Sequence, residues 1–448
     1  MNRSSSAFLR APYVATLFAL AVTTFAARVE AGFTVSKTIP VTPSGDFDYL
    51  RFDPVSRHVF LALISGVAEV DPAAMQVGAA ITVGAGQLRG ITVSDDGKYL
   101  FIGSYSGARV TRVEIATRTV MGTATAGSGT DFIVYDPASK KIFAGNHDGG
   151  SATVIDAATM MAVKTLMFQA GSSTEGLVTD GAGKVYVNLS GSNAIAEIDT
   201  AALTVTNQWP LGAGLQGPTG LAIDSANHRL FSAVGNKLAV VDATTGKAIT
   251  TVPIGGGADG AAFDPGAKLI FTANGDSGTL SVIRQDTPDT YTKVEDAKLA
   301  SGCRTITLDP VTHTVFTICR AGTPAALSLV VATDPTLPAT PAGTDAGAPG
   351  NSDVGSAGGS GGNDAAAMDA AVPPSGSGGT SAGGTGGVMM GGGTGGVVSS
   401  GSGGTSGGTP SNASGSSGCA IADATPAPAL ATVALLLALM IRRRARRE

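Results

Sequence analysis

The sequence predicts an all-β protein whose central part, residues 32–333, is a seven-bladed β-propeller. Aromatic residues recur seven times at intervals of 40 to 45 residues, and most follow an Asp-containing turn. Between them, short apolar stretches alternate with turn residues, which indicates short β-strands. A repeat of this length built from short strands is typical of one propeller blade. The seven positions are Phe60, Phe101, Phe143, Tyr186, Phe231, Phe271 and Phe316.

The fifth repeat illustrates the four strands expected in each blade. TGLAID, RLFSAV, KLAVVD and KAITTVPIG are apolar or alternating stretches, and SANH, GN and ATTG between them are turns. An Asp ends several third strands, and we interpret it as a turn residue that bonds local backbone. These residues are Asp71, Asp156, Asp199 and Asp242.

The seventh repeat supplies only three strands before the chain becomes rich in Pro and Gly. The missing outer strand is expected at the other end of the propeller, because FTVSKTIPV, residues 33–41, resembles the fourth strand of the fifth repeat. We therefore predict that residues 33–41 complete blade seven and pair its otherwise open edge.

Residues 1–31 are predicted to be a signal peptide. Two arginines precede an apolar run over residues 11–27, which is short for a membrane span. Small residues before Gly32 fit cleavage there, while cleavage after Ala26 and an uncleaved N-terminal anchor are the alternatives. Each of these interpretations predicts that the propeller is exported.

Two cysteines fall within the seventh repeat. Cys303 begins its first predicted strand and Cys319 ends the second, so the two residues should face each other across the hairpin. An exported protein meets oxidising conditions, which permit a disulfide. We predict a Cys303–Cys319 disulfide, and a pair of free buried thiols is the alternative.

The C-terminal part of the chain loses the strand pattern. Residues 334–418 consist mainly of Gly, Ser, Ala, Thr and Pro, a composition with too few large apolar side chains to form a core, so we predict a disordered linker. Residues 419–448 contain Cys419, a short hydrophobic segment predicted to be a helix, and five arginines. The arginines should stay cytoplasmic, which leaves the propeller outside the membrane.

This tail resembles the C-terminal sorting signals of myxobacterial surface proteins, in which a Gly-Cys pair precedes a hydrophobic stretch and an Arg cluster. The resemblance implies processing near Cys419, lipid on that cysteine and anchoring at the cell surface. A plain C-terminal transmembrane anchor is the alternative. Both tether the propeller outside the cytoplasmic membrane.

The charge balance argues against nucleic acid as a partner. The chain has 29 basic and 34 acidic residues, and five of the basic ones lie in the tail. Phosphate binding needs a basic surface, which the acidic remainder does not supply. We expect a monomer without a bound cofactor.

One position of the repeat, read as a column across the seven aligned repeats, is mostly charged. The residue that begins each innermost strand should lie at one mouth of the axial channel, where the loop after each second strand adds further groups such as His147. Four acids and two arginines occupy this column. Its members are Asp48, Arg89, Asp131, Glu175, Thr219, Asp259 and Arg304.

Two interpretations of this column stay open. In the first, Asp131, Glu175 and Asp259 are oxygen ligands of a divalent cation such as calcium or of a polar ligand, and the two arginines hold an anionic group. In the second, the acids and arginines pair with each other in a solvated rim. A hard cation needs six or more oxygens at close range.

The repeat resembles the bacterial YVTN-repeat propellers. The shared order is an aromatic strand, a V-x-V-I-D strand, an A-T-x-G turn and a closing strand, and FAGN at 143–146 and FTAN at 271–274 match the naming motif most closely. The resemblance covers all seven repeats. It implies the propeller fold strongly and an activity only weakly, because such propellers include binding modules.

The motifs favour binding over catalysis. The sequence contains no Ser-His-Asp arrangement, HExxH motif or phosphate-binding loop, and its single tryptophan argues against quinone-cofactor propellers. We predict a cell-surface-anchored module that binds a protein, glycan or small ligand through the channel face. The alternative is an exported lactonase-like hydrolase, with or without a divalent cation.

Overall fold

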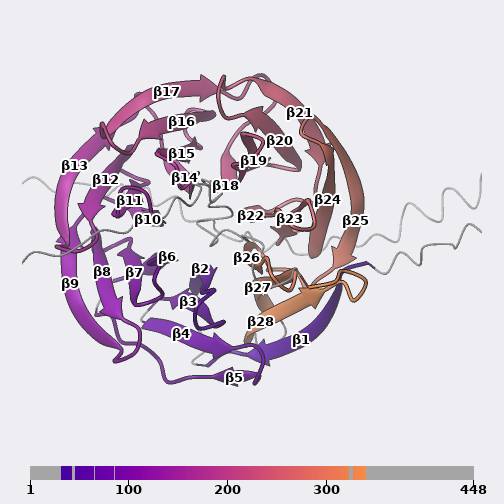
Figure 1. Ribbon diagram of the computed structural model, residues 1–448, viewed down its shortest axis with the longest axis horizontal. Coiled ribbons are helices and arrows are strands. Elements are labelled where there is room, and N and C mark those ends of the chain that lie inside the picture. Colours follow the sequence, from indigo (N-terminus) through magenta and orange to yellow (C-terminus); the bar gives the residue numbers. More distant parts are fainter. Residues whose placement is uncertain (1–31, 43–45, 65, 85, 322–325, 340–448) are drawn as a thin grey trace, which may run out of the picture. The chain divides into compact units, whose positions relative to one another are not determined.

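The computed structural model describes residues 32–42, 46–64, 66–84, 86–321 and 326–339. In these ranges the strands form seven four-stranded sheets around a central axis, which confirms the all-β seven-bladed propeller (Figure 1). No helix in these ranges is suited to crossing a membrane. The predicted signal peptide, most of the linker, and the C-terminal segment with Cys419 lie outside the described residues.

Each blade runs outward from the axis in antiparallel order. Blades one and two contain β2 (Phe47–Phe52), β3 (Val59–Leu63), β4 (Gly66–Asp71), β5 (Gln76–Val77), β6 (Leu88–Val93), β7 (Tyr99–Ser104), β8 (Arg109–Glu114) and β9 (Thr119–Thr125). Blades three and four contain β10 (Thr130–Asp136), β11 (Lys141–Asn146), β12 (Ser151–Asp156), β13 (Met161–Met167), β14 (Thr174–Thr179), β15 (Lys184–Leu189), β16 (Ala194–Asp199) and β17 (Thr204–Pro210).

The remaining three blades follow the same order. Blades five and six contain β18 (Pro218–Asp224), β19 (Arg229–Val234), β20 (Lys237–Asp242), β21 (Ala248–Pro253), β22 (Ala258–Asp264), β23 (Leu269–Asn274), β24 (Thr279–Thr287) and β25 (Thr290–Lys298). Blade seven contains β26 (Thr305–Asp309), β27 (Thr314–Ala321), β28 (Ala326–Thr333) and β1 (Thr34–Pro40).

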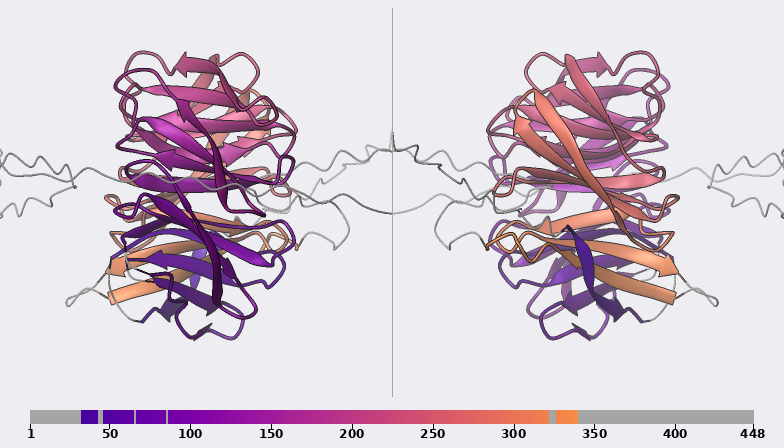
Figure 2. Two further views of the ribbon diagram at one scale, coloured as in Figure 1. Left: turned by 90° about the vertical axis from the view of Figure 1, so that its left-hand side faces the viewer. Right: turned by 90° about the vertical axis from the view of Figure 1, so that its right-hand side faces the viewer.

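The N-terminal strand closes the ring. β1 pairs antiparallel with β28, and its Ile39 lies opposite Leu329. Figure 2 shows the indigo β1 beside the orange β28. Ile39 is buried with Phe316 and other apolar residues of blades seven and one. The predicted closing strand is therefore confirmed, and the first and last parts of the propeller share one sheet.

The predicted disulfide is also confirmed. Cys303, just before β26, is bonded to Cys319 on β27, and both residues are buried. The described chain continues past the predicted start of the linker, because residues 334–339 form a turn. Its Leu337 packs against the apolar cluster between blades six and seven.

The repeated aromatic residues anchor the core. All seven have at most 4 % of their surface exposed, and the buried apolar side chains gather where neighbouring blades face each other. Phe101 of blade two stacks on Tyr135 of blade three at 5.8 Å between ring centroids. Burying one such ring contributes roughly 2 kcal/mol. The repeat of 40 to 45 residues thus places one large ring at each blade-to-blade contact.

The residues at the C-terminal ends of the innermost strands form a ring around the channel, which we call the turn rim. It comprises Asp53, Ser94, Asp136, Asp180, Asp224, Asp264 and Asp309. Asp264 accepts hydrogen bonds from the backbone N–H groups of Gly266 and Ala267, and its other oxygen lies 2.7 Å from His313 Nδ1 in blade seven. Asp136 likewise accepts a hydrogen bond across blades, from the Thr179 hydroxyl of blade four. The turn rim therefore joins neighbouring blades.

The Asp residues after the third strands are turn residues, as predicted. Asp71 accepts hydrogen bonds from the N–H groups of Ala73 and Ala74, and the Ala74 N–H lowers the pKa of Asp71 below its usual value. Asp156 and Asp199 show the same arrangement. A charged acceptor is preferred at such turns because it satisfies exposed backbone donors.

Candidate binding site at the channel mouth

The predicted column of charges forms one rim of the channel, which we call the charged rim: Asp48, Arg89, Asp131, Glu175, Thr219, Asp259 and Arg304. In six blades the pairing register of the innermost strand shifts at this position, as between Thr130 and Ile133 around Asp131. Such β-bulges leave a residue outside the ladder and change the direction of its side chain. Blade seven instead presents Arg304 just before β26, next to the disulfide.

Arg89 links two carboxylates of the charged rim. Its Nη1 lies 3.1 Å from Asp131 Oδ2, and its Nε lies 3.4 Å from Asp48 Oδ2. The guanidinium also lies over the ring of Tyr105, 4.1 Å from the centroid, which holds it in place by a cation–π contact. Blades one, two and three are therefore connected at the mouth by one arginine.

His147 extends the same network toward blade four. Its Nδ1 lies 3.0 Å from Asp148 Oδ1 and its Nε2 lies 3.3 Å from Glu175 Oε1. The Tyr105 hydroxyl donates to Asp148 at 2.6 Å, which connects this group to Arg89. Hydrogen bonding to Glu175 raises the pKa of His147 to about 9, so the imidazole is charged at neutral pH.

The opposite side of the charged rim holds a separate ion pair. Arg304 Nε lies 3.1 Å from Asp259 Oδ2, and the guanidinium lies over the ring of Phe47. Thr219, the uncharged member, donates its hydroxyl to the Ala258 carbonyl at 2.5 Å. Both arginines that were candidates for an anionic ligand are thus paired with carboxylates of the rim.

The carboxyl groups of the charged rim are close enough to repel one another. Burial, with repulsion from Asp131 and Asp259, raises the pKa of Asp48 well above its usual value. Burial raises the pKa of Asp131 to about 7, despite the opposing effect of Arg89. Burial also raises the pKa of Asp259, and repulsion from Glu175 adds to this increase. Groups whose pKa values are perturbed in this way occur more often at functional sites than elsewhere.

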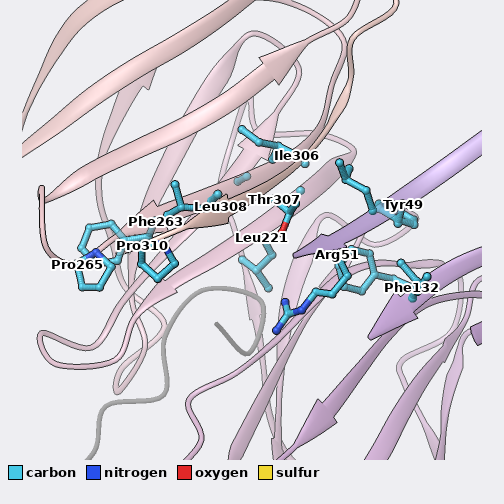
Figure 3. Close-up of a pocket in the computed structure, with 16 residues that line it drawn as sticks. Tyr49, Arg51, Phe132, Leu221, Phe263, Pro265, Ile306, Thr307, Leu308 and Pro310 are labelled. Atoms are coloured by element: carbon cyan, nitrogen blue, oxygen red, sulfur yellow. The ribbon is translucent and has the colours of Figure 1, made fainter. Parts of the chain in front are cut away.

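The channel beneath the charged rim is narrow. Its cavity has a volume of about 40 Å³ and is lined by Tyr49, Phe132, Leu221 and Ile306 (Figure 3). The rings of Tyr49 and Phe132 meet edge to face at 4.5 Å. At Gly90 a Cβ would lie 2.1 Å from the Asp131 carbonyl oxygen, so a glycine is required for the inner strands to approach this closely. The cavity is large enough for water-sized molecules only.

A divalent-cation site is one of the two interpretations that the sequence leaves open for this column. The part of the chain that the structure describes contains no group of three or more His, Cys, Asp or Glu side chains arranged to hold a metal ion. Asp131 and Asp259 instead face Arg89 and Arg304. These contacts agree with the pairing described in the second interpretation of the sequence, but Asp48 and Asp131 are buried rather than solvated.

Sequence reasoning missed Tyr105 and Tyr49. Tyr105 is the first residue after β7, just as His147 is the first residue after β11, so aligning the loops after the second strands reveals it. Tyr49 follows Asp48 where blades two, four, five and six have glycine, and that contrast marks it as a residue that fills the channel. Asn146 and Asn274, which end β11 and β23 just before such loops, are buried and bond local hydroxyls.

Comparisons with known proteins support the fold. No protein-family model and no curated protein matches the chain. A chain in a crystal structure of the mitotic checkpoint complex aligns with a TM-score of 0.57 at 16% identity, covering 75% of this chain and 100% of that one. A chain of Kuenenia stuttgartiensis hydrazine synthase aligns with a TM-score of 0.55 at 14% identity, covering 62% and 94%. At these identities the likeness concerns the propeller fold alone, and the YVTN-repeat resemblance stays a prediction.

Proposed function

We propose that the protein is a binding module that takes its ligand at the charged rim. The observation that carries this proposal is the group of buried carboxyl groups at the β-bulges, among them Asp131 with a pKa of about 7. Burying charged groups is costly, and the fold does not need them there, because the core is built from aromatic and aliphatic contacts between blades. Propellers commonly serve as interaction modules, and this mouth offers polar recognition groups.

A ligand screen that compares two matched variants tests this proposal. Thermal shifts of the full chain are measured against panels of glycans, peptides and small metabolites. The rim variant carries Asp131→Asn and Asp259→Asn, and the control carries Asp286→Asn on the exposed hairpin of blade six. Ligands that raise Tm in the wild type and the control should lose most of that shift in the rim variant. Full shifts in the rim variant would place binding elsewhere.

We further propose that the module is a YVTN-repeat propeller exported by residues 1–31 and anchored at the cell surface through residues 419–448. The Gly-Cys pair, hydrophobic segment and Arg cluster support this assignment. Expression in a myxobacterial host, followed by protease shaving of intact cells, tests it. The wild type should be shaved from the surface, and Cys419→Ala should lose anchoring. Retention of both proteins in the cytoplasm would contradict the proposal.

One observation favours hydrolysis as a second candidate. A carboxyl group with a pKa of about 7 is suited to general acid or base catalysis at neutral pH, and Asp131 lies in the same network as His147. The lactonase-like alternative predicts turnover of lactones or esters that Asp131→Asn or Glu175→Gln abolishes without unfolding the ring. Absence of turnover across a lactone and ester panel, with and without chelator, would remove this candidate.

A further inference from the structure

One oxygen of the charged rim lacks a hydrogen bond. Asp131 has only 5 % of its side chain exposed, and its Oδ2 faces Arg89. Its Oδ1 is buried and accepts no hydrogen bond from the residues that the structure describes. A buried carboxylate oxygen without a donor is costly, and native structures usually provide one. This oxygen therefore lacks a donor, and a ligand can supply one when the Asp131 side chain turns the oxygen toward the mouth.

The charges around this oxygen favour a cationic donor. The charged rim and His147 together carry four carboxyl groups but three cationic groups, and Asp148 adds a further negative charge beside His147. Each cation already has an acidic partner: Arg89 is shared between Asp48 and Asp131, and His147 between Asp148 and Glu175. Arg304 pairs with Asp259. One more positive charge would relieve the mutual repulsion that these carboxyl groups show.

We propose that the charged rim binds a primary ammonium group of its ligand, with the Asp131 carboxylate as the direct acceptor. This inference rests on the proposed binding function and names the chemistry of the ligand. An ammonium group is a compact charge with three donors, so it suits carboxylates that approach from several blades. The carbon chain that carries the ammonium group extends outward from the mouth, because the cavity beneath it, lined by Tyr49 and Phe132, has a volume of only about 40 Å³.

Ammonium binding should depend on pH in a defined direction. The groups that face Asp131 are Arg89 from β6, Asp48 and Tyr49 from β2, Glu175 from β14, Asp259 from β22 and His147 from the loop after β11. A bound cation favours the ionised carboxylate, so binding releases the proton that Asp131 holds below its pKa of about 7. The Kd should fall roughly tenfold between pH 6 and pH 8, because one proton is linked to binding.

Calorimetry on the full chain tests the proposal with a charged and a neutral probe. Nα-acetyl-lysine methylamide carries the ammonium group, and its Nε-acetylated analogue has nearly the same shape without the charge. At pH 8 and low salt the charged probe should bind and the neutral analogue should not. Asp131→Asn should weaken binding at least tenfold, whereas the exposed control Asp286→Asn should not change it. Thermal melting of each variant checks that the ring stays folded.

Three further probes distinguish the sources of the ammonium group. The probes are lysine-containing peptides for a protein ligand, glucosamine for an amino sugar and 1,5-diaminopentane for a diamine. The probe that binds most tightly identifies the class of ligand. Equal binding of the charged and neutral lysine probes, or no binding of any amine at millimolar concentration, would overturn the inference. If neutral ligands from the screen still depend on Asp131 and Asp259, the proposed function stands and only the ammonium assignment fails.

Discussion

Both rims of the channel carry aspartates, at opposite ends of the innermost strands. The aspartates of the two rims differ in how their oxygens are hydrogen-bonded. In the turn rim, Asp264 is fully buried, and both of its oxygens have partners, two backbone N–H groups and the His313 imidazole. In the charged rim, Asp131 is almost as buried, but one of its oxygens lacks a donor and its pKa is raised to about 7.

The difference separates charges that stabilise the fold from charges that are candidates for binding. Burial alone does not distinguish the two aspartates, whereas completeness of hydrogen bonding does. The turn-rim carboxylates are satisfied by groups of this chain, so they stabilise the contact between blades. The charged-rim carboxyl groups repel one another, and Asp131 keeps one oxygen without a donor among the described residues, which is why we propose this rim as the binding site.

The comparison predicts its largest effect at Asp264. Asp264→Ala removes the acceptor for two turn N–H groups and the carboxylate facing the buried His313, whose pKa that hydrogen bond raises. Breaking a buried pair of this kind should lower the free energy of unfolding by about 3 kcal/mol. Denaturant unfolding followed by tryptophan fluorescence measures the change.

Asp156→Ala is the matched control for this substitution. Asp156 also accepts hydrogen bonds in a turn, from the Thr159 N–H and hydroxyl, but it lies at the exposed end of β12 and has no partner in a neighbouring blade among the bonds described. Its loss should cost about 1 kcal/mol. Equal costs for Asp264→Ala and Asp156→Ala would show that the contact across blades contributes little.

A change of opposite sign is expected at Asp131. Because its folded pKa is raised from 3.8 to about 7, the ionised carboxylate destabilises the fold once the pH exceeds the unfolded pKa, and the effect grows up to about pH 7. Asp131→Asn should therefore raise the free energy of unfolding by about 2 kcal/mol at pH 8 and by nearly nothing below pH 3.8. Unfolding curves over this pH range measure the difference.

A destabilising effect of Asp131→Asn at pH 8 would break the comparison between the rims. It would mean that the ion pair with Arg89 outweighs the cost of burial and repulsion at the charged rim. Asp131 would then stabilise the blades as Asp264 does, and the argument for an open acceptor would lose its energetic basis. Arg89→Gln in the same background would confirm which contact is responsible.

Much of the fold could be predicted from the sequence because it repeats locally. The aromatic residues, the turn aspartates and the closing strand recur in one pattern, and Cys303 and Cys319 lie on one hairpin, so their positions follow from strand spacing alone. The charged column was found by the same alignment. The strand pairing of β1 with β28 then confirmed the expected ring closure.

The contacts within the charged rim could not be predicted in this way. Arg89 lies between Asp48 and Asp131 because bulges turn these side chains and because the inner strands approach closely at Gly90. Bulges depend on pairing between strands, and the distance between blades depends on packing of the whole ring. The sequence therefore identified the charged residues but left open whether they bind a cation or pair with each other.

The smallest expected effect concerns His147, beside the charged rim, and it should depend on pH. Its pKa rises from 6.5 to about 9 in the folded state, mainly through the hydrogen bond with Glu175, so the protonated form stabilises the fold. This stabilisation is complete below the unfolded pKa of 6.5 and is lost as the pH rises through about 9. Because 30 % of the side chain is exposed, His147→Gln should cost only about 0.5 kcal/mol at pH 6 and almost nothing at pH 10. A cost that does not change with pH would show that His147 acts by packing, and NMR titration of its ring resonances would separate the two explanations.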